Sequence, residues 1–140
     1  MRLAVADTTL LRPWLGGLRD WLRAASAVTA LVGTRTYLGA LPLGSPLPAL
    51  VVSRVGGGMD GYTYDAAMIQ VEAWAASGSQ AETLITAAVT VLASAPEATA
   101  LNASAQLMGA RLNALLWFPD PDTDIPRYIA TVDVDVRAVA

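Results

Sequence analysis

The sequence predicts a single α+β domain over residues 1–140, in which a four-stranded antiparallel sheet of two hairpins carries two main helices on one face, in the order α-ββ-α-ββ. Two segments repeat apolar residues at three- and four-residue steps, which is typical of amphipathic helices. Two other pairs of segments are β-branched or alternating and are joined by turn residues, which is typical of hairpins. A chain of 140 residues also suits one hydrophobic core of ordinary size.

The first helix is predicted over residues 10–25. Asp7, Thr8 and Thr9 supply candidate N-caps, and Pro13 fits only in the first turn. The pair Gly16–Gly17 weakens this helix. Its apolar stripe, which we expect to face the core, is Leu11, Trp14, Leu15, Leu18, Trp21, Leu22 and Ala25. Ser26 to Gly33 is predicted as a short helical turn that ends at the glycine.

The first hairpin follows a connection rich in proline and glycine, Leu38 to Pro48. We predict one strand from Pro48 to Val55 and a second from Ala66 to Ala76. The intervening segment, Gly56 to Asp65, contains four glycines and is expected to form a long, flexible loop at the hairpin tip.

The second helix is predicted to begin at a capping box formed by Ser79 and Glu82, and to stop before Pro96. Its apolar stripe is Ala81, Leu84, Ile85, Ala88, Val89 and Leu92. Residues 96–107 are expected to be a connection. The second hairpin then consists of strands from Met108 to Phe118 and from Arg127 to Ala138.

Side-chain alternation assigns the faces of this sheet. Successive residues of a strand point to opposite faces, so the aliphatic set of the second and fourth strands shares one face. We expect that face to lie under the helices; its members are Ile69, Val71, Ala73, Val132, Val134 and Val136. The opposite face is expected to be mixed, with Trp74, Trp117, Met68 and Leu115 among charged residues.

Composition argues against several classes of function. The net charge is −3 and the basic residues form no cluster, which disfavours sequence-independent nucleic-acid binding. The chain has no Cys, His or Lys, so Ser-His and Cys-His nucleophiles and a lysine Schiff base are impossible. We therefore expect no catalytic residues and no cofactor. The N-terminus shows no pattern of a signal peptide, and the longest apolar stretch is too short to span a bilayer, so we expect a soluble protein.

The run Asp120-Pro-Asp-Thr-Asp resembles the opening of a calcium loop. Such a loop needs Gly at its sixth position and a bidentate Glu at its twelfth, which are Ile125 and Thr131 here. Asp and Pro between two strands are what a turn requires. We therefore predict a hairpin turn and no metal.

Two further patterns have ordinary explanations. Asp133 and Asp135 share one strand face and could be paired catalytic carboxylates, but ion pairs with neighbouring arginines are the simpler explanation. Gly56 to Gly61 matches G-x-G-x-x-G, yet a strand-like segment follows in place of the helix that a dinucleotide site needs.

The 54% of hydrophobic residues is high for a small domain, and we expect part of this surface to lie in contacts between chains. Large aromatic residues and methionine often anchor such contacts. The predicted subunit or partner interface consists of Arg54, Met59, Tyr62, Tyr64, Met68, Glu72, Trp74, Arg111, Trp117, Asp133, Asp135 and Arg137.

Five segments follow one another in a distinctive order: VTALVGTRTY (28–37), LP…LPALVV (41–52), QVEAWAAS (70–77), the helix AETLITAAVTVL and WFPDP…RYIATVDVDV. Their order resembles the phage tail terminator family, the small tail-completion and head–tail joining proteins of long-tailed phages. The resemblance spans about Trp14 to Arg137.

This resemblance implies a structural virion protein without an active site. It implies a homohexameric ring that caps the tail tube, stops its polymerisation and presents the joining surface for the head connector or neck protein. The ring would assemble in the host cytoplasm and stay at the head-proximal end of the tail, with DNA only passing through its lumen. The alternatives are another neck or tail-tube ring subunit and a small α+β ligand-binding module.

Overall fold

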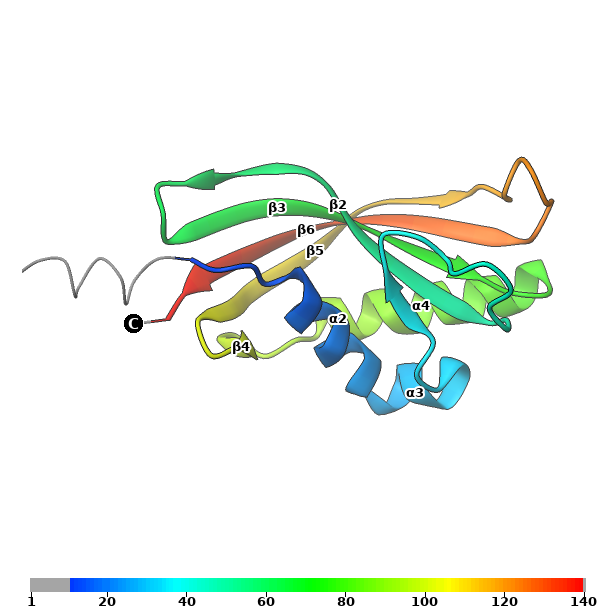
Figure 1. Cartoon of the computed structure of the whole chain (residues 1–140), viewed down its shortest axis with the longest axis horizontal. Coiled ribbons are helices and arrows are strands. Elements are labelled where there is room, and N and C mark those ends of the chain that lie inside the picture. The colour runs from blue at the N-terminus through cyan, green and yellow to red at the C-terminus, as the bar shows by residue number, and fades with distance from the viewer. Residues whose placement is uncertain (1–10, 140) are drawn as a thin grey trace, which may run out of the picture.

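The computed structural model describes residues 11–139 and shows helices and a strongly twisted sheet (Figure 1). The predicted N-caps at residues 7–9 lie outside the described residues. The elements in chain order are α2 (Leu15–Ala24), α3 (Ser26–Val32), β1 (Thr36–Leu38), β2 (Ala49–Asp60), β3 (Tyr64–Trp74), α4 (Gly78–Ala93), β4 (Thr99–Asn102), β5 (Ala105–Trp117) and β6 (Arg127–Ala138).

The sheet differs from the predicted one. It has six strands in the order β1-β2-β3-β6-β5-β4, and it is mixed because β1 runs parallel to β2 while the other neighbours are antiparallel. The prediction of four antiparallel strands with two main helices is therefore wrong, because the structure adds β1 and β4. The short helical turn predicted from Ser26 to Gly33 is confirmed, and it forms a third helix, α3. Both extra strands are very short. Strand β1 ends where the predicted connection Leu38–Pro48 begins, and β4 lies within the predicted connection of residues 96–107.

The helices cover one face of the sheet, and the core lies between the two layers (Figure 1). The face assignment from alternation is confirmed for β3 and β6. Ile69, Val71 and Ala73 are fully buried, as is Val136, and Val132 and Val134 are 1% exposed. Leu18 and Leu22 of α2 and Leu84, Ile85 and Leu92 of α4 pack against this aliphatic face.

Val134 provides a test of this core. Removing two methyl groups from a side chain that is 1% exposed leaves a cavity that the surrounding sheet cannot fill, so Val134→Ala is expected to lower the free energy of unfolding by about 2 kcal/mol. Arg137→Ala, on the same strand but exposed, is the matched control and should stay within about 0.5 kcal/mol of wild type. Urea denaturation measures both. Equal midpoints for the two variants would contradict the assignment of the faces.

Helix α2 begins at Leu15, later than predicted, with Trp14 at its N-cap and Pro13 outside the helix. Its N-terminal turn lies against β4, where the Asn102 amide donates to the backbone carbonyl of Pro13 at 2.9 Å. Gly17 makes the close approach possible, because a Cβ there would lie 2.0 Å from the backbone oxygen of Leu101. The glycine that weakens the helix by its intrinsic propensity is thus required by its packing.

Helix α4, in contrast, starts slightly earlier than predicted. The N-cap is Ser77, whose hydroxyl accepts a hydrogen bond from the backbone N–H of Gln80 at 3.2 Å. The predicted capping box with Ser79 at the N-cap is therefore wrong by two residues, although the buried stripe from Ala81 to Leu92 is confirmed. Across residues 11–139, no helix is long and apolar enough to cross a membrane.

The predicted glycine-rich loop is mostly strand. Strand β2 continues to Asp60 and pairs with β3 to the tip, so that the turn comprises only Gly61, Tyr62 and Thr63. The register shifts between Arg54 and Gly56, and Gly57 has φ +81°, a backbone conformation open to glycine but not to most residues. The glycines thus permit an irregular strand and do not form a flexible loop.

Candidate functional site

The side of the sheet away from the helices, here called the outer face, carries eight of the twelve predicted interface residues. Pairing across β3, β6 and β5 places Met68 beside Asp133, and Asp133 beside Arg111. These strands bring together Tyr64, Met68, Glu72, Trp74, Arg111, Asp133, Asp135 and Arg137 on one surface. Met59 and Tyr62 lie at the tip of the β2–β3 hairpin and are exposed.

The centre of the outer face holds an exposed ion pair and a shallow hollow. Arg111 Nη2 lies 3.2 Å from Asp133 Oδ2, and the Arg111 side chain is 81% exposed. Both residues line an open hollow of about 270 Å³ together with Met68 and Asp135. The nearby Asp135 carboxylate raises the pKa of Tyr64, because it favours the protonated hydroxyl. The predicted ion-pair role of Asp133 is confirmed.

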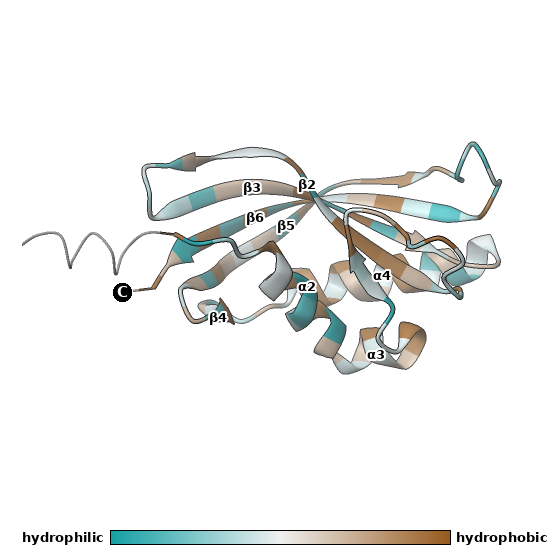
Figure 2. Cartoon of the chain, viewed as in Figure 1, coloured by the Kyte–Doolittle hydropathy of each residue, from teal (hydrophilic) through white to brown (hydrophobic). Residues whose placement is uncertain are grey.

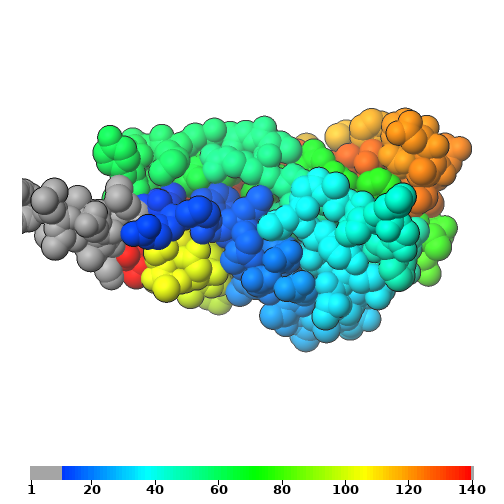
Figure 3. All heavy atoms as spheres, viewed as in Figure 1, coloured from blue at the N-terminus to red at the C-terminus, as the bar shows by residue number. Residues whose placement is uncertain are grey.

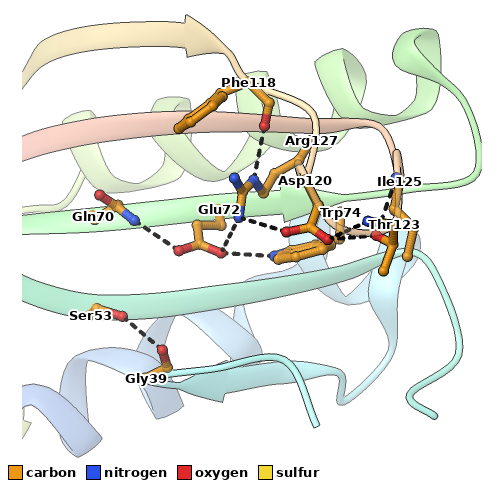
Figure 4. Close-up of polar contacts among 10 residues, drawn as sticks. All are labelled: Gly39, Ser53, Gln70, Glu72, Trp74, Phe118, Asp120, Thr123, Ile125 and Arg127. Atoms are coloured by element: carbon orange, nitrogen blue, oxygen red, sulfur yellow. Dashed lines mark hydrogen bonds and ion pairs between the residues drawn. The ribbon is translucent and has the colours of Figure 1, made fainter. Parts of the chain in front are cut away.

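Towards the β5–β6 loop, the Arg127 side chain contacts several residues of the outer face (Figure 4). Its guanidinium lies 4.8 Å from the ring centre of Trp74 and 5.1 Å from that of Phe118, and its Nε donates to the carbonyl of Phe118 at 2.9 Å. Glu72 lies 3.7 Å away and accepts from the Trp74 indole N–H at 2.9 Å. The side chains of Arg127, Glu72 and Trp74 are largely buried, so they stabilise the root of the loop and do not form an open pocket.

The aspartate run forms the predicted hairpin turn. Asp120 Oδ2 accepts from the backbone N–H of Thr123 at 3.0 Å and from its hydroxyl at 2.6 Å, and the Asp124 N–H donates to the Asp120 carbonyl. Asp124 takes a positive φ of 59°, which aspartate tolerates better than most residues. Among residues 11–139, no group of three or more His, Cys, Asp or Glu side chains is placed to hold a metal ion.

Three predicted interface residues lie on the helix side of the sheet: Met59, which pairs with Asp65 in the register, Arg54 and Trp117. Arg54 pairs with Ile69 in the register and points to the helix side, where it forms a bidentate ion pair with Asp65 at 2.6 and 2.8 Å. The Trp14 indole N–H donates to the same carboxylate at 3.0 Å. Asp65 is 2% exposed, and the hydrogen bonds from Arg54 hold its pKa below the ordinary value. The placement of Arg54 on the mixed face is therefore wrong.

Trp117 is also on the helix side, because β5 is bulged. The register between β5 and β6 shifts between Leu112 and Ala114, so one extra residue reverses the side-chain alternation beyond it. Trp117 consequently pairs with Tyr128, at 5.0 Å between ring centres, and its ring reaches Gly78 at the start of α4. Leu115 moves to the same side. Unbroken alternation from Arg111 predicts the opposite face for both residues.

The end of β5 exposes an apolar surface that the sequence analysis did not single out as a whole. Leu112 and Leu115 lie on the helix side and Leu116 on the outer side, so both faces of this strand are apolar. The exposed fractions lie between 40% and 52% for Leu112, Leu115, Leu116, Trp117 and Phe118. Figure 2 shows this hydrophobic strand end leading into the hydrophilic β5–β6 loop. An apolar segment exposed on both faces is typical of a surface that another protein covers.

An exposed apolar strand end such as that of β5 is typical of a subunit of a protein assembly. The chain belongs to the tail completion protein gp17 family, whose model matches residues 16–139. Among solved structures, one similar chain is part of the "Virion of native gene transfer agent (GTA) particle". That chain is 25% identical at a TM-score of 0.61, with 96% of this chain and 98% of that chain covered. Among curated proteins, no sequence matches. The protein is thus a structural component of a phage tail, and the resemblance drawn from the sequence is confirmed.

Proposed function

We propose that the protein assembles into a ring, with six copies as the resemblance implies, that caps the finished tail tube. The ring stops further addition of tube subunits and offers its other side to the head connector or neck protein. Its mechanism is occupation of the growing end, so no bond is made or broken and no active site is needed. DNA passes through the lumen, and the net charge of −3 is compatible with passage without binding.

The observation that supports this proposal most is the match to a virion chain over almost the whole length of both proteins. The domain therefore resembles that virion subunit over nearly the whole length of the matched chain. The family adds the assignment to tail completion. A ring of identical chains needs two different surfaces on each chain, because its contacts are head-to-tail. The apolar end of β5 is one such surface, and the outer face is available to a different partner in the tail.

Within this proposal, the charged residues of the outer face select the partner and its register. Arg111, Asp135 and Arg137 keep exposed charges at the centre and at the β2–β3 end of that face. Exposed charges at the rim of an interface contribute more to orientation and association rate than to affinity. Trp74 is 8% exposed and bonded to Glu72, so we assign both residues to stabilisation of the face.

Tail length tests the proposal. Tails assembled in the absence of the protein are expected to have abnormal and variable lengths, because nothing occupies the growing end, and supplying the protein should restore one length. Electron microscopy measures the length distribution, and native mass spectrometry should give a mass that is an integral multiple of the chain mass. Normal tail length without the protein, together with headless tails, would instead favour a neck subunit. A chain that is monomeric in solution and dispensable for tails would contradict both assignments.

A further inference from the structure

The sheet has one incompletely paired strand near each edge. Strand β1 pairs with β2 only at Leu50, Val51 and Val52, and β4 pairs with β5 only between Ala105 and Leu107. Within residues 11–139, no strand pairs with the outward side of β2 from Ser53 to Asp60, or of β5 from Met108 to Trp117. Each stretch therefore presents backbone N–H and C=O groups to which a further strand can bond.

The free stretch of β5 is bulged, but its second half lacks the charged and proline residues that commonly protect an edge strand. Soluble proteins commonly place lysine, proline or inward charges on a long exposed edge. From Leu112 to Trp117 this edge carries no charged residue, and its large apolar side chains are about half exposed on both faces of the sheet. An edge of this composition is expected to be covered by a strand of another chain.

The free stretch of β2 has the features of the missing strand. Because β2, β3, β6 and β5 are successively antiparallel, β2 and β5 run in opposite directions in one copy. A neighbouring copy in the same orientation thus presents its β2 antiparallel to β5, as in the rest of the sheet. The free stretch of β2 also carries two exposed apolar side chains, Val55 and Met59.

Charge supports the same pairing. Arg111 is near the beginning of the free stretch of β5 and is exposed, and Asp60 is at the end of β2 and is exposed. Antiparallel pairing of the two stretches brings these opposite charges to the same end and places Val55 towards Leu115. The β2–β3 hairpin tip and the β5–β6 loop lie at opposite ends of the face shown in Figure 3, so one copy can engage two neighbours.

We propose that a second copy of the chain binds at the free stretch of β5, by antiparallel pairing of Met108–Trp117 with Ser53–Asp60 of the neighbour. The contact joins two different surfaces, so every copy uses both, and repetition closes into a ring when the rotation between copies allows it. This inference rests on the proposed ring and specifies its subunit contact. The sheets of successive subunits then form one continuous β-structure around the ring.

Cysteine cross-linking tests the contact, since the natural chain contains no cysteine. The variant that combines Val55→Cys with Leu115→Cys should form, under mild oxidation, a ladder of covalent oligomers that ends at the ring size. Each single variant alone should remain non-covalent. The matched control combines Gln80→Cys, an exposed position on α4, with Leu115→Cys and should give no ladder.

A second, independent test introduces a charge at the free edge of β5 and measures ring formation. Leu116→Lys adds a charge to the exposed edge, and it should leave the melting temperature unchanged while reducing ring formation at least tenfold in native mass spectrometry. Thr83→Lys, exposed on α4, should do neither. Two results together would overturn the strand pairing while preserving the proposed function: the Leu116→Lys variant forms rings normally, and the V55C/L115C variant forms rings but no covalent ladder. A chain that never forms rings would overturn both.

Discussion

Replacing Gly17 with alanine is expected to lower the free energy of unfolding by about 3 kcal/mol, at the upper end of the range for overpacking substitutions. A Cβ at this position would lie 2.0 Å from the carbonyl oxygen of Leu101 and 2.7 Å from its carbonyl carbon. Both contacts are with backbone atoms, so no side chain can rotate away. Helix α2 would have to move off β4, and the Asn102–Pro13 hydrogen bond would be lost with it.

The adjacent glycine is the matched control for this prediction. A Cβ at Gly16 meets nothing within 4 Å, so Gly16→Ala should only improve helix propensity and be neutral or stabilising by up to about 1 kcal/mol. Urea denaturation of the two variants under identical conditions measures the difference. If both variants have the wild-type midpoint, α2 can shift without cost, and the contact with β4 does not restrict it.

The sequence predicts the long helices and strands well, because the spacing of their apolar residues shows which face is buried. The stripe of α4 and the alternation of β6 extend over several periods, and each period adds evidence for the same face. Strands β1 and β4 cannot be found in this way because each is too short to show a period. They become strands only because β2 and β5 lie beside them, and this tertiary information is not local to the segments.

The candidate site was predictable where alternation is unbroken. Met68, Glu72, Asp133 and Asp135 lie on the outer face as their positions in β3 and β6 predict. Trp117 was misplaced because a single-residue bulge after Leu112 leaves no clear signal in the sequence. Arg54 was misplaced for another reason. Alternation with Val52 puts it on the helix side, against the general preference of charged residues for solvent. Its partner Asp65 becomes visible only in the register of the hairpin.

Replacing Asp65 with alanine is expected to destabilise the fold by about 3 kcal/mol. Removal of one member of a buried ion pair leaves its partner without compensation, and the typical cost is about 3–5 kcal/mol. The lower end applies here because the Arg54 side chain is 35% exposed and water can solvate part of it. The change also removes the acceptor of the Trp14 indole N–H, which connects the segment before α2 to β3. Trp14 is 5% exposed, so its N–H has little access to water as a substitute.

The pH dependence of Asp65→Asn separates the effect of the charge from that of packing. The hydrogen bonds from Arg54 lower the pKa of Asp65 in the folded state below its unfolded value of about 3.9. The stabilisation by this carboxylate is therefore fully present above about pH 4, and it is lost as the pH falls through the folded pKa. The difference in unfolding free energy between wild type and Asp65→Asn should be constant from pH 7 to about pH 5 and should shrink below about pH 4.

Asp20→Asn, which removes an exposed ion-pair partner, should cost less than about 1 kcal/mol throughout. Urea titrations at successive pH values measure both, and a difference for Asp65→Asn that stays constant down to pH 3 would show that the charge of Asp65 does not stabilise the fold.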